Sequence, residues 1–229
     1  MILIDLNQVL FSGLMAQISS TKGLTIDENL VRHLALNILR THIKKFKSEY
    51  GDVVICCDNK KYWRRDIFPF YKIHRKRDRE KSDLDWTLIF ECLNKIRDEL
   101  KSHFPHRVLE VEGAEADDII ATLVKHYHDK EKIMIVSSDK DFQQLFRYSN
   151  VKQYSPIKKS LVTCTEPDRY LFEHIIKGDK GDTGDKGDKG DRGDDGVTPT
   201  PEDIIKVITD NKSTKLSKAL GAVIDIADV

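Results

Sequence analysis

The sequence predicts an α/β fold in which a mostly parallel central sheet is flanked by helices. Two observations lead to this prediction. Short apolar runs with the length of buried strands recur between Met1 and Asp139, and segments with helical periodicity separate them. Strands that alternate with helices favour parallel pairing, because each helix returns the chain to the edge of the sheet at which the next strand begins.

The first part of the predicted fold contains two strands and a long helix. Ile2–Ile4 is a short buried strand that ends at Asp5. Asp27 is suited to cap a helix running to about residue 50, because its carboxylate accepts hydrogen bonds from free N–H groups of the first turn. The apolar face of this helix comprises Leu30, Leu34, Ile38 and Phe46. The second strand is Val53–Cys57, which ends at Asp58.

The next elements continue the alternation. Ser82 is predicted to cap a helix, Val108–Val111 to form the third strand and Ala114–Tyr127 to form another helix. The apolar stripe of the helix after Ser82 comprises Trp86, Ile89, Leu93, Ile96 and Leu100. Lys132–Val136 is the fourth strand, and a short helix at about Glu166–Lys177 closes the region.

The composition indicates a soluble globular protein. The chain has 229 residues, of which 33% are charged, and its 38 basic and 38 acidic residues give a formal net charge of +0. The longest stretch without a charge, Leu6 to Thr21, is too short and too polar to span a membrane. The N-terminus has no basic leader, so no signal peptide is expected.

The cysteines fit a reducing, cytoplasmic location. Cys56 and Cys57 are adjacent in a predicted strand, so their side chains point to opposite faces of the sheet. No C-x-x-C spacing is present. Buried free thiols are therefore expected, rather than a zinc site or a disulfide framework.

One segment is strongly basic despite the neutral total. Lys60–Lys81 contains ten basic and three acidic residues, a net charge of +7, interleaved with aromatic side chains. Such a segment attracts a phosphate backbone. A solvated helix face has the same charge pattern, and charge alone does not separate the two interpretations.

The composition changes at Gly178. From Gly178 to Gly196 glycine recurs at every third position, aspartate follows each glycine up to Gly193, and proline is absent. This is the period of collagen, but without proline it favours a hydrated loop or linker over a triple helix. We therefore expect three regions: an α/β domain at 1–177, an acidic repeat at 178–196 and a short helical segment at 197–229.

Acidic residues follow three of the predicted strands, at Asp5, Asp58 and Asp139. The carboxyl ends of parallel strands meet at one edge of a sheet, so these side chains should converge there. Further acids nearby in the sequence are Glu115, Asp117, Asp118 and Asp141. Taken singly, the acids at 115–118 could simply complement a helix dipole. Together, an all-oxygen set favours two Mg²⁺ ions, or Mn²⁺ in their place, a common arrangement for phosphodiester hydrolysis.

Eight short motifs occur together in this chain, in the order LIDLNQ, VRHLALN, CCDNKKYWRRD, a YK–R stretch beginning at Tyr71, EADD, SSDKDF, NVKQYSP and IIKGDKGD. In this order the sequence resembles the phage ribonuclease H branch of the 5′-nuclease superfamily, relatives of flap endonucleases with a PIN-like fold. The resemblance covers residues 1–182. It implies a Mg²⁺-dependent 5′→3′ nuclease that removes RNA primers or 5′ flaps during phage DNA replication.

The resemblance also implies roles for single residues. The first metal site and its neighbours correspond to Asp5, Asp58, Glu115, Asp117 and Asp139, with Asp118 beside them and acting through water. The second metal site corresponds to Asp141, Asp179 and Asp182. The helical gateway that binds the scissile phosphate corresponds to Lys72 and Arg75, and Tyr71 matches an aromatic stacked near a substrate base. Further phosphate contacts are expected at Lys76, Arg77 and Arg79, whereas His33 is expected to be an ordinary helix residue.

The sequence departs from the family after Asp182. Members of the family continue at this point into a helix–hairpin–helix element, whereas this chain has further G-D-x triplets. Asp185/Asp188 and Asp191/Asp194 have the same spacing as Asp179/Asp182, so the spacing alone does not identify the pair that faces the second metal. Lys212–Val223 resembles a remnant of that element only weakly, and the repeats also resemble tail-fibre proteins. The alternatives to an active nuclease are a nucleic-acid-binding remnant with impaired catalysis, a nuclease fused to a collagen-like module, and a trimeric structural protein.

The resemblance also implies the partners of the protein. They are DNA and RNA–DNA hybrids with 5′ ends or flaps, and a single-strand-binding protein, and the chain itself is expected to be a monomer.

Overall fold

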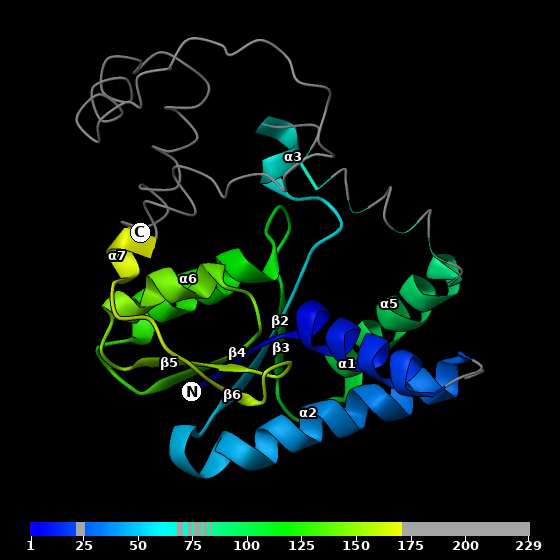
Figure 1. Cartoon of the computed structure of the whole chain (residues 1–229), viewed down its shortest axis with the longest axis horizontal. Coiled ribbons are helices and arrows are strands. Elements are labelled where there is room, and N and C mark those ends of the chain that lie inside the picture. The colour runs from blue at the N-terminus through cyan, green and yellow to red at the C-terminus, as the bar shows by residue number, and fades with distance from the viewer. Residues whose placement is uncertain are drawn as a thin grey trace, which may run out of the picture. The chain divides into compact units, whose positions relative to one another are not determined.

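The computed structural model describes residues 1–21, 26–67, 71–72, 75, 79, 82 and 84–170 (Figure 1). These residues all lie within one compact unit, Met1–Phe172. The predicted boundaries at 177/178 and 196/197, the Gly-Asp repeat and Lys212–Val223 lie outside the described residues. Of the helices in the described ranges, none is both long and apolar enough to cross a lipid bilayer.

A six-stranded sheet forms the centre of the fold, in the order β3-β2-β1-β4-β5-β6. The strands are β1 (Ile2–Asp5), β2 (Val53–Cys57), β3 (Arg107–Glu110), β4 (Ile133–Val136), β5 (Val151–Ser155) and β6 (Ser160–Val162). The first five pair in parallel, and β6 pairs antiparallel to β5 at the edge. The prediction of a mostly parallel α/β sheet is confirmed.

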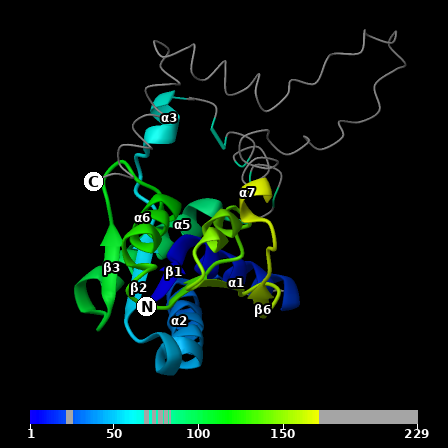
Figure 2. The same ribbon diagram turned by 90° about the vertical axis from the view of Figure 1, so that its left-hand side faces the viewer.

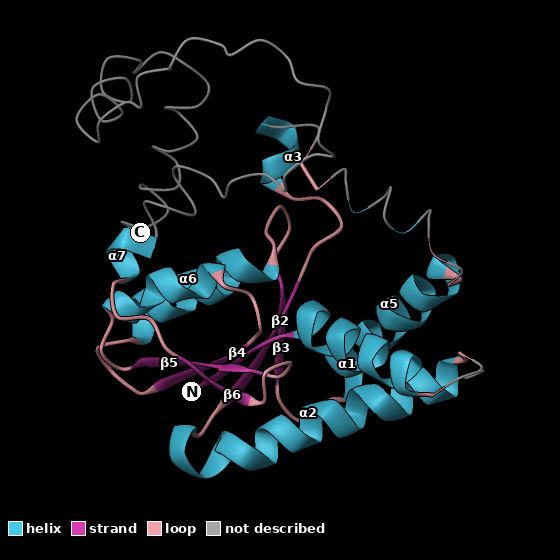
Figure 3. Cartoon of the chain, in the orientation of Figure 1, coloured by secondary structure: helices cyan, strands magenta, loops and turns pink. Residues whose placement is uncertain are grey.

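Helices cover both faces of the sheet. One face packs against α1 (Leu6–Ser20), α2 (Glu28–Tyr50) and α5 (Trp86–His103). The other packs against α6 (Ala116–Tyr127) and the 3-10 helix η1 (Asp141–Arg147). Figures 2 and 3 show α6 and α2 on opposite sides of the strands. Two short helices, α3 (Trp63–Ile67) and α7 (Pro167–Tyr170), complete the described elements.

The alternation of side chains along each strand explains this layering. Ile2 and Ile4 belong to the core beside α1 and α2, and Leu3 belongs to the core beside α6. Cys56 and Cys57 likewise enter opposite cores, and both are buried free thiols, as the sequence predicts. These strands are buried on both faces, which suits a parallel sheet covered by helices.

Several predicted details are wrong. The helix after Ser82 begins at Trp86 and is capped by Asp85, whose Oδ1 accepts a hydrogen bond from Leu88 N at 3.0 Å. Ser82 instead accepts a hydrogen bond from Leu84 N at 3.3 Å, within the preceding turn. In α2 the prediction of Phe46 is confirmed, and Leu34 and Ile38 are partly buried against the core. The fully buried residues of the first turns are Val31, Ala35 and Leu39, one position after the predicted Leu30, Leu34 and Ile38. The Asp27 cap is confirmed, with Leu30 N donating to its Oδ1 at 2.8 Å.

Candidate active site

Asp5 lies where β1 meets α1, and its two carboxylate oxygens accept hydrogen bonds from different elements. Its Oδ1 accepts a hydrogen bond from Gln8 N at 3.1 Å, which caps α1. Its Oδ2 accepts a hydrogen bond from the Ser137 hydroxyl at 3.1 Å, just after β4. Because β1 and β4 are adjacent and parallel, their carboxyl ends meet and Asp5 is only 5% exposed.

Asp58 extends the same edge of the sheet past β2. Its Oδ1 accepts a hydrogen bond from Ala116 N at 2.8 Å, at the first residue of α6. Its Oδ2 accepts one from the Asn7 side chain at 2.8 Å, in the first turn of α1. Asp58 therefore connects the ends of two strands with the starts of two helices.

Asp5, Asp58, Asp117 and Asp139 lie close enough for their negative charges to raise the pKa values of Asp5 and Asp117. Burial raises the pKa of Asp5 well above its usual range, and the nearby charges of Asp117 and Asp58 raise it further. Burial, followed by the charges of Asp139 and Asp58, raises the pKa of Asp117 from the ordinary 3.8 to about 7. Carboxylates from three strand ends and one helix thus repel one another, as the sequence argument expects of a cation site.

Glu115 is surrounded by donors rather than by acids. It is 2% exposed, and its oxygens accept hydrogen bonds from Lys72 Nζ at 2.8 Å, Arg64 at 2.8 Å and the Tyr71 hydroxyl at 3.2 Å. Burial lowers the pKa of Lys72, but the hydrogen bond to Glu115 and the negative charge of Glu115 together outweigh this and leave the Lys72 pKa above its ordinary value. The ammonium group is therefore charged and lies beside the carboxylates.

Asp118 connects α6 with α3. Both of its oxygens accept hydrogen bonds from Arg64, at 2.8 Å each, and its Oδ2 also accepts one from the Trp63 indole at 3.2 Å. The same oxygen accepts a hydrogen bond from Glu115 N at 2.9 Å and completes a capping box at the start of α6. In the structure Asp118 thus contacts protein donors.

A buried amide orders the loop that carries Asp139. Gln153 on β5 is 0% exposed, and its Nε2 donates to the carbonyl oxygens of Ser137 at 2.8 Å and Asp139 at 2.6 Å. Asp139 N in turn donates to the Ser137 hydroxyl at 3.1 Å, and Asp139 Oδ1 accepts from Asp141 N at 2.9 Å. One polar network therefore sets the positions of Asp5, Asp139 and the start of η1.

The remaining predicted residues lie less centrally or outside the described ranges. Arg75 is exposed, and the Arg79 guanidinium lies 5.2 Å from the centroid of the Phe90 ring. His33 is an exposed helix residue that hydrogen-bonds Asn37, as expected. Lys76, Arg77, Asp179 and Asp182 lie outside the described residues.

The donor chemistry fits a divalent cation, although the acids do not form a closed set of ligands. Within the described ranges, no three His, Cys, Asp or Glu side chains are placed so that they could hold one ion. The acids are nevertheless all-oxygen donors, and burial and mutual repulsion disfavour their charged forms in Asp5 and Asp117. A bound cation would remove that repulsion.

Sequence reasoning missed several side chains that complete the site: Asn7, Trp63, Arg64, Ser137 and Gln153. Arg64 lies inside the basic segment and in the motif CCDNKKYWRRD, so the charge pattern includes it without distinguishing it from Arg65. Ser137 and Gln153 lie in the quoted motifs or beside them, but nothing in their residue types indicates a contact between β4 and β5.

Comparison with known proteins places this geometry in a family. Residues 1–173 match the family described as 5′-3′ exonuclease, N-terminal resolvase-like domain. The chain is 41% identical over 184 residues to Ribonuclease H of Enterobacteria phage T4, covering 78% of this chain and 60% of that protein. It is 32% identical over 111 residues to a 5′-3′ exonuclease of Buchnera aphidicola subsp. Acyrthosiphon pisum (strain APS), covering 48% and 36% of the two chains.

Solved structures show the same fold. A T5 5′-exonuclease with bound zinc matches with a TM-score of 0.56 at 18% identity, over 78% of this chain and 62% of that chain. A bacteriophage T5 flap endonuclease in a complex with DNA and metal ions matches with a TM-score of 0.55 at 19% identity, over 78% and 61%. The chain thus spans about three fifths of the phage proteins that it matches. With the family match covering residues 1–173, this chain belongs to the 5′-3′ exonuclease family, through its N-terminal resolvase-like domain.

Proposed function

We propose that the protein is a metal-dependent phosphodiesterase, a 5′→3′ nuclease that removes RNA primers or 5′ flaps during phage DNA replication. The observation that carries this proposal is the convergence of Asp5, Asp58, Asp117 and Asp139 at one edge of the sheet, with Lys72 and Arg64 directly beside them. Acids that hold cations and bases that bind phosphate are the two components of phosphodiester hydrolysis.

Mg²⁺ is the proposed cofactor, as two ions, and Mn²⁺ would replace it. Asp5, Asp58, Glu115, Asp117 and Asp139 would hold the first ion. The second would be held by Asp141, Asp179 and Asp182, of which only Asp141 lies in the described ranges. Such ions supply an activated water and stabilise the charge that develops on the phosphate. The relatives with bound divalent metal support this assignment.

The basic side chains would bind and orient the phosphodiester. Lys72 and Arg64 are positioned by the buried Glu115, so their charges face the acids instead of open solvent. Arg75 would add a second phosphate contact, and Tyr71 would stack near a base while its hydroxyl donates to Glu115. Phosphate contacts of this kind give affinity without sequence preference.

The proposed substrates are DNA and RNA–DNA hybrids with 5′ ends or flaps. The similarity to a phage ribonuclease H, to 5′-3′ exonucleases and to a flap endonuclease in complex with DNA supports these substrates. We further propose that the protein acts as a monomer beside a single-strand-binding protein.

The test is cleavage of a 5′-labelled flap and of an RNA–DNA hybrid in Mg²⁺. We expect short labelled products from the wild type and at least a hundredfold less product, on the scale of losing one essential group, from Asp139→Asn. The matched control is Asp129→Asn, which changes an exposed aspartate after α6 and should cleave normally. Binding without cleavage by the wild type would refute the nuclease and favour the alternative of an impaired nucleic-acid-binding protein.

A further inference from the structure

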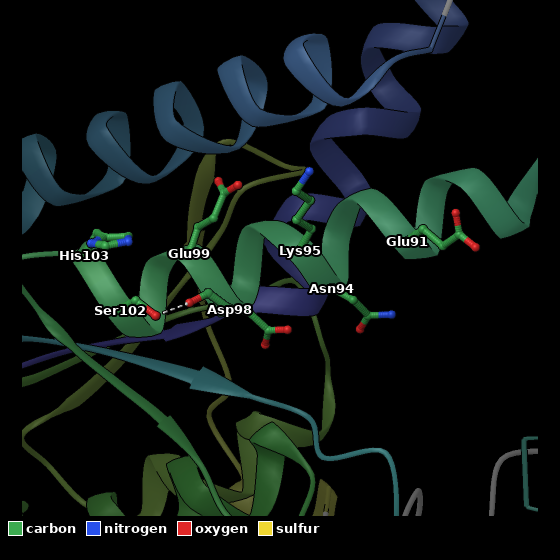
Figure 4. Close-up of a pocket in the computed structure, with 7 residues that line it drawn as sticks. All are labelled: Glu91, Asn94, Lys95, Asp98, Glu99, Ser102 and His103. Carbon is green, nitrogen blue, oxygen red and sulfur yellow. Dashed lines mark hydrogen bonds between the residues drawn. The ribbon is translucent and has the colours of Figure 1, made fainter.

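The two helices that pack side by side on one face of the sheet, α2 and α5, present differently charged surfaces to solvent. On α5 a groove of about 510 Å³ is lined by Glu91, Asn94, Lys95, Asp98, Glu99, Ser102 and His103 (Figure 4). Its lysine is neutralised, because Lys95 Nζ lies 2.7 Å from a Glu28 oxygen. Arg32 of α2 likewise binds Glu99 at 2.7 Å. The cations of this groove therefore have carboxylate partners.

The second half of α2 differs. A groove of about 550 Å³ is lined by Asn37, Arg40, Thr41, Lys44 and Lys45, which we call the α2 basic surface. Residues 37–48 contain four Lys or Arg residues and no Asp or Glu. Within the described ranges, no carboxylate lies at salt-bridge distance from Arg40 or Lys44, and both side chains are exposed.

This arrangement is unfavourable for the helix by itself. Arg40 and Lys44 are four residues apart, and Lys44 and Lys47 are three apart, so like charges are neighbours on one side of the helix. Each such pair of like charges destabilises an isolated helix. Burial does not compensate this cost, because both residues of the first pair are exposed.

The edge of the surface is ordered by a contact with the sheet. Lys45 Nζ lies 3.8 Å from the centroid of the Tyr154 ring, and Tyr154 on β5 is buried. Strand alternation places the exposed Lys152 on the same face of β5 as Tyr154. The positive surface thus has a cation at a set position beside the groove and a further lysine on the neighbouring strand.

We propose that the α2 basic surface binds the phosphate backbone of the nucleic-acid substrate, at a place separate from the candidate active site. This inference rests on the proposed function. The charge is complementary to phosphate. The Asn37 amide, which hydrogen-bonds His33, has a second N–H to donate to a phosphate oxygen, whereas the Thr41 hydroxyl donates to the Asn37 carbonyl oxygen. From Asn37 to Lys47 the helix rises about 15 Å, the length of roughly four base-pair steps.

The α2 basic surface and the acids of the candidate active site occupy different parts of the fold. α2 ends at Tyr50, and the chain then enters β2 at Val53, so this end of α2 lies at the amino edge of the sheet. Asp58 follows β2 at the opposite, carboxyl edge. The α2 basic surface precedes this end of the helix, because Lys45 contacts Tyr154, which pairs with Val136 at the end of β4. It lies on the face of the sheet that α2 covers, whereas the acids lie beyond the carboxyl ends of the strands, so its contribution is to affinity.

The experiment is a salt titration of binding to a fluorescent RNA–DNA hybrid several helical turns long, with the full chain and without divalent cations. The double variant Arg40→Ala/Lys44→Ala should reduce the slope of log K against log salt concentration by about 2, because two phosphate contacts are lost. Between about 50 and 200 mM salt, the wild type should then lose roughly tenfold more affinity than the variant. In Mg²⁺ the variant should show a raised KM and an unchanged kcat.

Two control variants make the result specific. Lys95→Ala/Lys101→Ala removes the same charge from α5, but its lysines already bind Glu28 and Glu110, so the slope should stay at the wild-type value. Arg40→Lys/Lys44→Arg keeps the charge and should also retain the slope. The inference would be overturned if Arg40→Ala/Lys44→Ala had the same salt-dependence slope as the wild type. If the wild type still bound and cleaved the hybrid in that case, the proposed function would remain intact. Absence of binding by the wild type would overturn both.

Discussion

Glu115 and Gln153 show how single residues build this site from opposite chemistry. Glu115 is a buried acid with three donors, Arg64, Lys72 and Tyr71. Gln153 is a buried donor with two carbonyl acceptors, those of Ser137 and Asp139. The first brings basic groups to the acids, and the second fixes the loop from which one of the acids projects.

The acids at strand ends could be predicted from the sequence because their position follows from strand length alone. Asp5 and Asp58 each directly follow an apolar run, and parallel pairing then brings them together. Arg64 and Gln153 could not be predicted in the same way. Their roles depend on contacts across 54 residues, between Arg64 and Asp118, and across 14 residues, between Gln153 and Asp139. A pattern of neighbouring residues in the sequence does not indicate contacts between residues so far apart.

Replacement of Gln153 by leucine should weaken both stability and catalysis. The change keeps the side-chain size but leaves the carbonyl oxygens of Ser137 and Asp139 without their buried donor, at a cost of about 1–3 kcal/mol. We expect a lower Tm and a kcat reduced more than KM is changed, because the Asp139 loop is displaced. Gln143→Leu on η1 is the control and should resemble the wild type. Wild-type stability of Gln153→Leu would contradict the described network.

Replacement of Asp117 by asparagine should stabilise the metal-free protein while abolishing cleavage. The folded pKa of about 7 exceeds the ordinary 3.8, so the unfolded chain releases this proton first as the pH rises. Folding therefore becomes less favourable between about pH 4 and pH 7, and the penalty is complete above pH 7.

Thermal unfolding in EDTA across this pH range measures the effect. Asp117→Asn should flatten the decline in Tm and gain on the order of 4 kcal/mol above pH 7, since the pKa is raised by about three units and one unit corresponds to about 1.4 kcal/mol. A pH profile identical to that of the wild type would show that Asp117 carries no raised pKa.

At the scale of elements, strong caps and apolar stripes could be predicted, and contacts made by tertiary structure could not. α2 is where Asp27 and its periodicity predict it, and β2 has the predicted bounds. The segment that forms α1 contains no charged residue to mark a solvent-facing side, so the sequence does not predict this helix. β5 and β6 were missed as well, because β6 has only three residues and gains its hydrogen bonds from β5. Ser82 and Asp85 are both suitable caps, and the residue nearer the apolar stripe proved to be the cap.

Asp118 should hold α3 against the start of α6. Asp118→Ala removes acceptors of Arg64, Trp63 and Glu115 N together. We expect faster amide hydrogen exchange in α3 with unchanged exchange in the central strands, because the sheet makes none of these contacts. Asp66→Ala replaces an exposed acid of α3 itself and should leave exchange in α3 as in the wild type. Equal exchange in Asp118→Ala and wild type would refute this role.

At the scale of the whole molecule, the zero net charge predicted from composition conceals separate surfaces. The acids gather at the carboxyl edge of β1, β2 and β4, while the second half of α2 carries cations that have no carboxylate partner among the residues that the structure describes. The fold class could be predicted because strand and helix patterns alternate over the first part of the chain. Asp179 and Asp182 of the predicted second metal site lie outside the described residues, as does the Gly-Asp repeat, so those predictions stay predictions.

The most direct test of the account is the initial rate of cleavage of a 5′-labelled RNA–DNA hybrid as Mg²⁺ is titrated. The account predicts no cleavage in EDTA, a saturable rise with Mg²⁺, and release of short products from the 5′ end. It also predicts that Asp117→Asn shows no such rise while binding the hybrid like the wild type. Cleavage in EDTA, or wild-type rates from Asp117→Asn across the Mg²⁺ titration, would contradict the claim that these carboxylates form a metal-dependent nuclease site.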